Sequence, residues 1–267
     1  MLVNHELPLN ALHLSREIND YEFILPHLLD KYPEYLDHFV EAKLKGRYTM
    51  MDNSLHELKD TNNGEGYDQD KFLYWVNQLK PNTIFIPDVW ENMEKSLQNA
   101  RKWAKIDVPY ETEKIAVIQA KNITEAVNCT AEYINMGYEY LAFSYGASYY
   151  PKHGNPSTYP DITKASGRAN IIKALIDLRI IHENIKIHLL GTMTPYEYTF
   201  YKDIPNIKTL DTSNPVMCAL EGTTYKLPYF TKEKPKANIN NHFNIPLTNQ
   251  TLELIKYNCN LLKTFLN

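Results

Sequence analysis

The sequence predicts an α/β domain whose parallel strands close into a (β/α)8 barrel. Six segments of buried-strand character, each followed by a loop or a helical pattern, end near residues 52, 88, 119, 144, 190 and 211. A repeat of roughly thirty residues is typical of strand–helix units, and no antiparallel pair interrupts the series. The length of 267 residues also suits one barrel, which takes about 250. We therefore expect residues 1–267 to form a single domain.

The first two strands are expected from residues 1–33, where the pattern is least regular. Residues 6–14 hold a short apolar run that we interpret as one strand or two very short ones. A helix over 34–45 is better defined, and Gly46 stands where helices commonly end. Its apolar face is expected to consist of Leu36, Phe39, Val40 and Leu44. The barrel should therefore be irregular near its N-terminus.

From residue 47 onward the alternation is clearer. Strands are expected over 47–52, 83–88, 115–119, 140–144, 186–190 and 208–211, and helices over 70–80, 91–104, 122–137, 166–182 and from Thr248 onward. The loops over 53–66 and 149–165 are much longer than the usual two to six residues or so. Both would lie at the carboxyl end of the barrel, where long loops are typically functional or mobile.

Composition limits the possible partners. The net charge of −4 excludes a generally basic surface, so nucleic-acid binding would need a local patch. Cys129, Cys218 and Cys259 are scattered without a C-x-x-C pair, which indicates reduced thiols and no structural zinc. A signal-peptide pattern and apolar runs near ~18 residues are both absent, so we expect no membrane partner and a cytoplasmic location.

Three aspartates end three of the expected strands, at Asp52, Asp88 and Asp211. A barrel brings such strand ends together around one pocket. Singly, each could be a helix cap or a loop aspartate. Together, two carboxylates about 5 Å apart can divide the nucleophile and general-acid duties at an anomeric carbon. The pattern favours glycosyl transfer or glycoside hydrolysis.

Other strand ends suggest how a ligand could be held. Gln119 can pair a donor and an acceptor with a planar heterocycle, and Ser144-Tyr145-Gly146 offers backbone groups and a ring for stacking. Either could instead be a loop-closing feature. His56 and Glu57 are adjacent and point in different directions, so we expect no metal site there. His188 is expected to be an inner strand residue with local hydrogen bonds.

The segment 223–247 mixes basic and aromatic residues. Lys226, Lys232, Lys234 and Lys236 alternate with Tyr225, Tyr229, Phe230 and Phe243. This mixture suits contact with a nucleic-acid backbone and stacking on unpaired bases. A solvated surface loop is the alternative interpretation.

Six short motifs occur in a characteristic order. They are Met51-Asp52-Asn-Ser, Pro87-Asp88, Val117-Ile-Gln119, Ala142-Phe-Ser-Tyr-Gly146, His188-Leu-Leu-Gly191-Thr-Met-Thr-Pro195 and Leu210-Asp211-Thr-Ser-Asn-Pro215. Over residues 47–215 the chain thereby resembles the tRNA-guanine transglycosylase superfamily. That superfamily carries, in the same order, D-S-G-G-F-Q, an aspartate opening D-E-C, Q-G, G-G-L, R-Y-L-M-G-V-G-x-P and D-C-V-x-P-T-R.

The resemblance implies a barrel enzyme that exchanges guanine in a nucleic acid for a free 7-deazaguanine base, such as the 7-cyano form, without a cofactor. Asp211 would be the nucleophile toward C1′ of the nucleotide, and Asp52 the general acid and base. Asp88, Gln119, the 144–146 turn and Gly191 would bind the base.

The chain also departs from the superfamily. It lacks the zinc-binding cysteines after the last strand and an appended RNA-binding domain, and Asn53-Ser54-Leu55 replaces the glycines of the first motif. It therefore looks most like the DNA-directed branch of phages and bacteria, with DNA favoured over tRNA, a monomer favoured, and host cytoplasm as the location if a phage encodes it. A retaining N-glycosidase or nucleosidase, and a binding module without catalysis, are the alternatives.

Replacing Lys226, Lys232, Lys234 and Lys236 together with Ala should weaken nucleic-acid binding and flatten its salt dependence, because each phosphate contact releases counterions. The dissociation constant at several salt concentrations measures both effects. Unchanged affinity with an unchanged salt slope would remove the segment from the interface.

Overall fold

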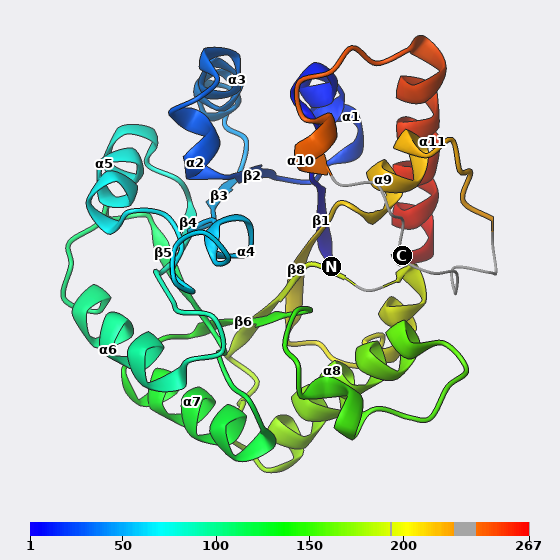
Figure 1. Cartoon of the computed structure of the whole chain (residues 1–267). Helices are drawn as coiled ribbons and strands as arrows, with labels where there is room; N and C mark the ends of the chain where they lie inside the picture. The colour runs from blue at the N-terminus through cyan, green and yellow to red at the C-terminus, as the bar shows by residue number, and fades with distance from the viewer. Residues whose placement is uncertain (193, 227–238, 267) are drawn as a thin grey trace.

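Eight parallel strands form a nearly closed barrel in the computed structural model, which describes residues 1–192, 194–226 and 239–266 (Figure 1). The strands are β1 (Leu2–His5), β2 (Glu22–Ile24), β3 (Thr49–Met51), β4 (Thr83–Phe85), β5 (Glu113–Val117), β6 (Tyr140–Ser144), β7 (Lys186–Leu190) and β8 (Ile207–Thr212). They are hydrogen-bonded in the order β1-β8-β7-β6-β5-β4-β3-β2. The predicted barrel is confirmed.

Side chains, rather than a strand ladder, join β1 to β2 at the two ends of this order. The backbone N–H of Val3 donates to Asp20 Oδ2 (2.9 Å), and that of His5 donates to Asn19 Oδ1 (2.7 Å). Asn4 Nδ2 donates in turn to the carbonyl of Tyr21 (2.7 Å). Carboxylate and amide groups thus supplement the backbone bond across this seam, from the N–H of Asp20 to the carbonyl of Val3 (3.0 Å).

The N-terminal strands lie within residues 1–33, as predicted, but the strand expected over 6–14 is wrong. Residues 9–14 form a 3-10 helix, η1 (Leu9–Leu14), and β1 precedes it. Within η1 the buried residues are Ala11, Leu12 and Leu14, and the three-residue spacing of Ala11 and Leu14 suits a helix rather than the two-residue period of a strand.

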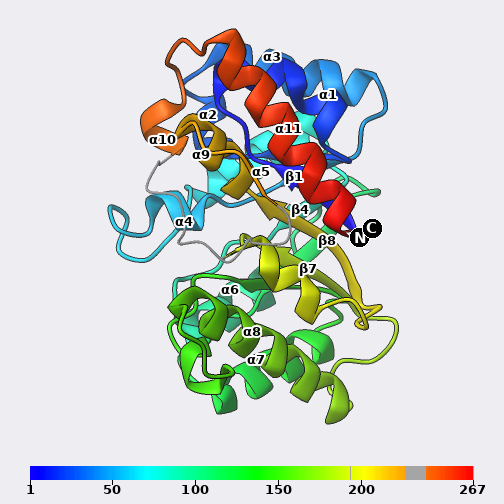
Figure 2. The same ribbon diagram turned by 90° about the vertical axis from the view of Figure 1, so that its right-hand side faces the viewer.

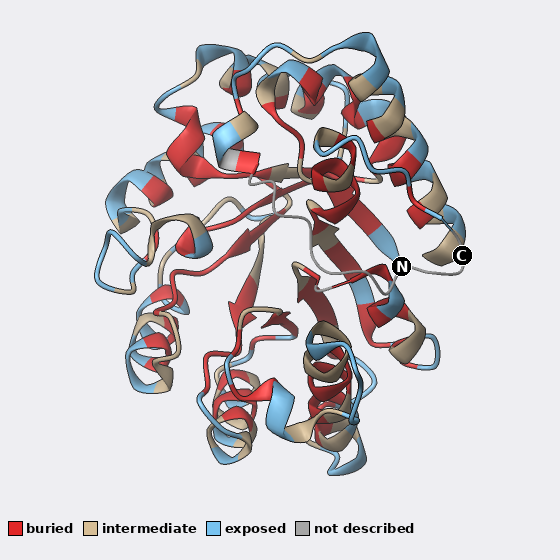
Figure 3. Ribbon diagram, turned by 45° about the vertical axis from the view of Figure 1, so that its right-hand side comes forward, coloured by how far each residue is buried: buried red, intermediate tan, exposed pale blue. Residues whose placement is uncertain are grey.

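Helices surround the barrel, most of them on its outside, and the short helix at residues 55–58 lies at its opening (Figures 1 and 3). They are α1 (Ser15–Ile18), α2 (Pro26–Leu29), α3 (Pro33–Leu44), α4 (Leu55–Leu58), α5 (Gln69–Leu79), α6 (Met93–Trp103), α7 (Ile123–Asn135), α8 (Pro160–Asp177), α9 (Asn214–Leu220), α10 (Ile239–His242) and α11 (Asn249–Leu266), with 3-10 helices η2 (Tyr150–His153) and η3 (Pro195–Phe200). None of the helices in this described part of the chain has the length and apolar character to cross a bilayer.

Two of these helices differ from the prediction. Helix α8 begins at Pro160 rather than 166, because proline suits the first turn of a helix as well as a loop. In α3, Phe39 is buried as expected, whereas Leu44 is 83% exposed. Tyr35 and Ala42 occupy the inner face instead.

The core has two parts. One fills the barrel interior and comprises Tyr21, Met50, Phe85, Ile115, Val117, Tyr140 and Ala142. The larger part lies between the strands and the inner faces of the helices, and it leaves the outer helix faces exposed (Figure 3). Helix α11 packs beside α1 and α9, close to the seam (Figure 2), and its Lys263 Nζ donates to Asp20 Oδ1 (2.6 Å). This helix therefore braces the side chain that bridges β1 and β2.

A buried ion pair ties α8 to the carboxyl ends of β6 and β7. Arg168 Nε donates to Glu197 Oε1 (2.7 Å), and the two side chains are 1% and 0% exposed. The guanidinium also donates to the carbonyls of Phe143 (3.0 Å) and Gly191 (3.0 Å). The attraction of Glu197 raises the pKa of Arg168 despite its burial. One cation thus fixes the backbone of two neighbouring strand ends.

Replacing either partner of this pair should strongly destabilise the protein. Arg168→Leu should lower the free energy of unfolding by about 3–5 kcal/mol, because the Glu197 carboxylate would remain buried without its cation. The double variant Arg168→Leu/Glu197→Leu should lose less than the sum of the single losses. Urea unfolding of the three variants measures this, and a loss under about 1 kcal/mol in both single variants would contradict it.

Candidate active site

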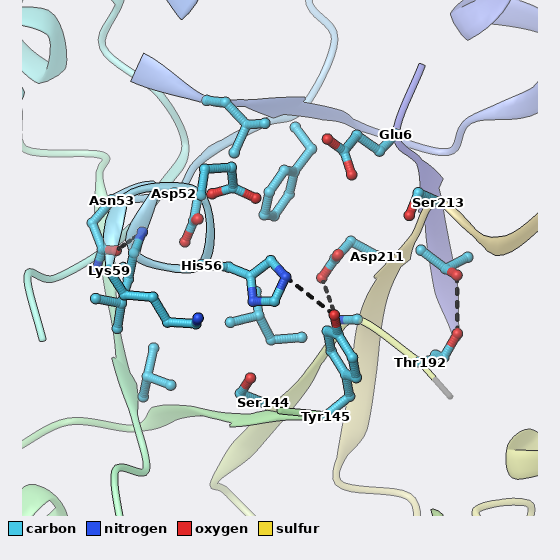
Figure 4. A pocket seen from close by; sticks show the side chains of 18 of the residues that line it. Glu6, Asp52, Asn53, His56, Lys59, Ser144, Tyr145, Thr192, Asp211 and Ser213 are labelled. Carbon is cyan, nitrogen blue, oxygen red and sulfur yellow. Dashed lines mark hydrogen bonds between the residues drawn. The ribbon is translucent and has the colours of Figure 1, made fainter. Parts of the chain in front are cut away.

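A cavity of about 570 Å³ opens at the carboxyl end of the barrel. Seven of the eight residues predicted to catalyse or bind substrate line it, namely Asp52, Asp88, Gln119, Ser144, Tyr145, Gly191 and Asp211. The carboxylates of Asp52 and Asp211 enter it from opposite sides (Figure 4). The strand ends that the sequence marked therefore do converge on one space.

Asp52 directly follows β3 and is fixed by a tight turn. Its Oδ2 accepts the backbone N–H of Ser54 (3.1 Å), and Ser54 has a left-handed backbone with φ of 56°. Burial raises the pKa of Asp52 well above its usual value, and the charges of Glu57, Asp88 and Asp211 raise it further. A carboxyl group in this setting holds its proton and can act as an acid.

Asp88 lies three residues beyond β4 and is held by two side-chain amides. Asn53 Nδ2 donates to its Oδ1 and Gln119 Nε2 to its Oδ2, each at 2.6 Å. The Gln119 Oε1 accepts the backbone N–H of Glu91 (2.8 Å), which fixes the amide orientation. Burial raises the pKa of Asp88 to about 6, although the two amide hydrogen bonds lower it. The Gln119 oxygen, which the sequence suggested as an acceptor for a ligand, is therefore engaged within the protein, and the two amides hold the Asp88 carboxylate rigid on one cavity wall.

Asp211 lies within β8, one residue before its end. Its Oδ1 accepts from His188 Nε2 (2.9 Å) and from the backbone N–H of Gly191 (3.1 Å). Gly191 has φ of 65°, and a Cβ there would lie 2.4 Å from Tyr145 Cδ1. Only glycine therefore lets this N–H reach Asp211 while Tyr145 closes the wall.

Aromatic rings gather at the mouth. The hydroxyl of Tyr145 and His56 Nε2 are hydrogen-bonded at 3.1 Å, and Lys59 Nζ lies 5.0 Å from the centre of the Trp90 ring. Gly146 does not line the cavity. A Cβ on Gly146 would lie 2.2 Å from Trp90 Cη2, so its glycine makes room for the indole.

The sequence did not reveal several of the lining residues. Glu6 follows β1 directly, so the strand-end rule would have found it had that strand been located at residues 2–5. Glu57 adds a further carboxylate whose pKa burial raises to about 8, with a contribution from the charge of Glu6. Trp90 follows Asp88 by two positions and lines the cavity on the same loop.

The lysines predicted to contact nucleic acid are mostly outside the described residues. Lys226 is exposed, and Lys232, Lys234 and Lys236 lie in 227–238, which the structure does not describe. Cys129, Cys218 and Cys259 are free thiols. Within residues 1–192, 194–226 and 239–266, His, Cys, Asp and Glu side chains form no group of three or more that could hold a metal ion.

The chain matches no model of a known protein family and no curated protein. The geometry and electrostatics of the cavity are therefore the basis for assigning a function.

Glu57→Gln should stabilise the protein at alkaline but not at acidic pH. The folded state raises the pKa of Glu57 from 4.5 to about 8, so it binds more protons than the unfolded chain between these values. Stability attributable to Glu57 therefore falls as pH rises through this window. The urea midpoint of the variant should exceed the wild-type midpoint increasingly up to pH 8 and show no such rise below pH 4.5. The exposed Glu94→Gln is the control, and a parallel pH profile for both variants would contradict the assignment.

Proposed function

We propose that the protein exchanges guanine in DNA for a 7-deazaguanine base through a covalent glycosyl-aspartate intermediate. One observation carries the proposal. Two carboxylates with different surroundings share one cavity: burial raises the pKa of Asp52, whereas Asp211 accepts two hydrogen bonds at a single oxygen. The first suits a proton donor, and the second a fixed nucleophile.

The reaction would proceed as two displacements at C1′ of the nucleotide. Asp211 forms an ester bond to C1′ as the bond from C1′ to N9 of guanine breaks, and the departing guanine takes the proton of Asp52. The incoming 7-deazaguanine then gives its N9 proton to Asp52 and bonds to C1′, which releases Asp211. Because each step inverts the configuration, the exchange retains it overall.

The wall around Asp88 supports a guanine-like ligand. Guanine and its 7-deaza analogues share the N1–H and 2-amino donors, and a carboxylate can accept both in one plane. Each Asp88 oxygen already accepts one amide hydrogen bond, which holds the carboxylate in place while a second acceptor direction remains on each oxygen. Tyr145 supplies a ring on another side of the cavity. A site that recognises the shared edge tolerates both the leaving and the incoming base.

We favour DNA over tRNA as the substrate because of the sequence alone. Only Cys218 and Cys259 follow the last strand, too few for the zinc site of the tRNA enzymes that the chain resembles. A base in a duplex would have to flip out of the stack to reach Asp211, so single-stranded DNA should react faster. Mass spectrometry of nucleosides from DNA and tRNA of expressing cells separates DNA exchange, tRNA exchange and simple base loss by an N-glycosidase.

Asp211→Asn should abolish both base exchange and the covalent adduct, because the amide cannot displace guanine. Asp52→Asn should slow both half-reactions by about 10²–10⁴-fold and leave DNA binding largely intact, since it removes only the proton transfer. Exchange of labelled guanine and denaturing gels of trapped protein–DNA adducts report the two steps. An Asp211→Asn protein with near wild-type exchange would falsify the assignment of the nucleophile.

A further inference from the structure

A chain of buried hydrogen bonds leads from the barrel interior to Asp211. The hydroxyl of Tyr140 on β6 bonds to Thr209 Oγ1 on β8. Thr209 Oγ1 lies 2.7 Å from His188 Nδ1, and His188 Nε2 lies 2.9 Å from Asp211 Oδ1. All four side chains come from three adjacent strands, so the hydrogen bonds run from strand to strand inside the barrel toward its carboxyl end.

The imidazole of His188 has no freedom to turn. The residue is fully buried, and its ring stacks on Phe23 at 6.2 Å with an interplanar angle of 13°. Phe85 meets the ring edge-on at 4.9 Å and 74°. The two ring nitrogens therefore keep fixed partners, Thr209 on one side and Asp211 on the other.

The donors and acceptors around His188 indicate which of its ring nitrogens carries the proton. Asp211 Oδ1 also accepts the N–H of Gly191, so it is an acceptor and Nε2 must carry the proton. In neutral imidazole Nδ1 is then an acceptor, which requires the Thr209 hydroxyl to donate to it. Thr209 Oγ1 in turn accepts from the Tyr140 phenol. Each donor in this series of hydrogen bonds, from Tyr140 to Asp211, then has one acceptor.

We propose that His188 is a positioning residue that, through its Nε2–H tautomer, holds Asp211 with Oδ1 anchored and Oδ2 directed to the reacting sugar carbon. Among the described residues both donors bond Oδ1 and none bonds Oδ2. Asp211 itself fixes the proton on Nε2, and Thr209 and Tyr140 support the ring from the Nδ1 side. The inference rests on the proposed function for its kinetic consequence, but the tautomer itself does not depend on the reaction.

The anchored oxygen remains an acceptor throughout the reaction. When Oδ2 bonds to C1′, Oδ1 becomes the ester carbonyl and still faces His188 and Gly191. When the ester breaks, the negative charge returns to a carboxylate whose hydrogen bonds are stronger than those of an ester. The pair of donors thus holds one geometry through both displacements and favours the departure of Asp211.

Thr209→Val and Thr209→Ser form a matched pair that tests this. Valine keeps the shape of threonine and removes the hydroxyl, whereas serine keeps the hydroxyl. Nitrogen-15 NMR of histidine-labelled protein, with the His188 signals assigned from His188→Gln, should show neutral imidazole protonated at Nε2 in the wild type and in Thr209→Ser. Thr209→Val should keep Nε2 protonated, because Asp211 is still an acceptor, but the signal of the unprotonated Nδ1 should shift because it loses its hydrogen-bond donor. Its base exchange should have a kcat about 10–100-fold lower at an almost unchanged KM.

Failure of this inference and failure of the proposed function would give different results. A wild-type His188 protonated at Nδ1, or at both nitrogens, overturns the inference, as does Thr209→Val with the kcat and the Nδ1 signal of Thr209→Ser. As a second variant, His188→Gln retains an N–H donor near the position of Nε2 and should keep more activity than His188→Leu. If the wild type shows the Nε2–H tautomer but exchanges no base in DNA or tRNA, the proposed function fails and the positioning of Asp211 by His188 stands.

Discussion

The geometry of the cavity depends on the guanidinium of Arg168, which does not itself line the cavity. Arg168, on α8, is held by Glu197 and donates to carbonyl groups at the ends of β6 and β7. Gly191 accepts one of these bonds through its carbonyl, and its N–H points the opposite way, to Asp211. The position of the proposed nucleophile is therefore set from the helix layer outside the barrel. A buried ion pair adds little net stability. When its groups also make several directional hydrogen bonds, it can restrict the surrounding backbone to one arrangement.

The cavity itself works against stability. Six carboxyl groups line it, those of Glu6, Asp52, Glu57, Asp60, Asp88 and Asp211. Burial and mutual repulsion raise the pKa of several of them, and the ammonium of the lining Lys59 is shared with the exposed Asp60 (2.8 Å). Such a concentration of acceptors is unfavourable in an empty protein and favourable to a ligand rich in N–H donors. Proteins commonly retain local conflicts of this kind where function requires them.

Much of this architecture could be predicted, because strand periodicity and strand-end polarity depend on short stretches of sequence. The sequence predicts strands β6 and β7 at their observed residues, and its polar strand ends supply seven of the residues that line the cavity. The features that the sequence does not predict correctly depend on tertiary contacts. Leu44 lies on an apolar stripe of α3 and yet faces solvent, because the barrel meets the helix on the side of Tyr35. His188 looked like a local strand residue, since nothing in the sequence pairs it with Asp211 before the register of β7 on β8 is known.

The pairing of β1 with β8 places Leu2 beside Thr209 and has a consequence for how the chain folds during synthesis. Strand β1 gains a ladder only once β8 has been made, since on the side of β2 it bonds to Asn19, Asp20 and the carbonyl of Tyr21, outside any strand ladder. Such a distant contact carries a large loop-closure cost and slows folding. The barrel therefore cannot close between β1 and β8 until residues 207–212 have been translated.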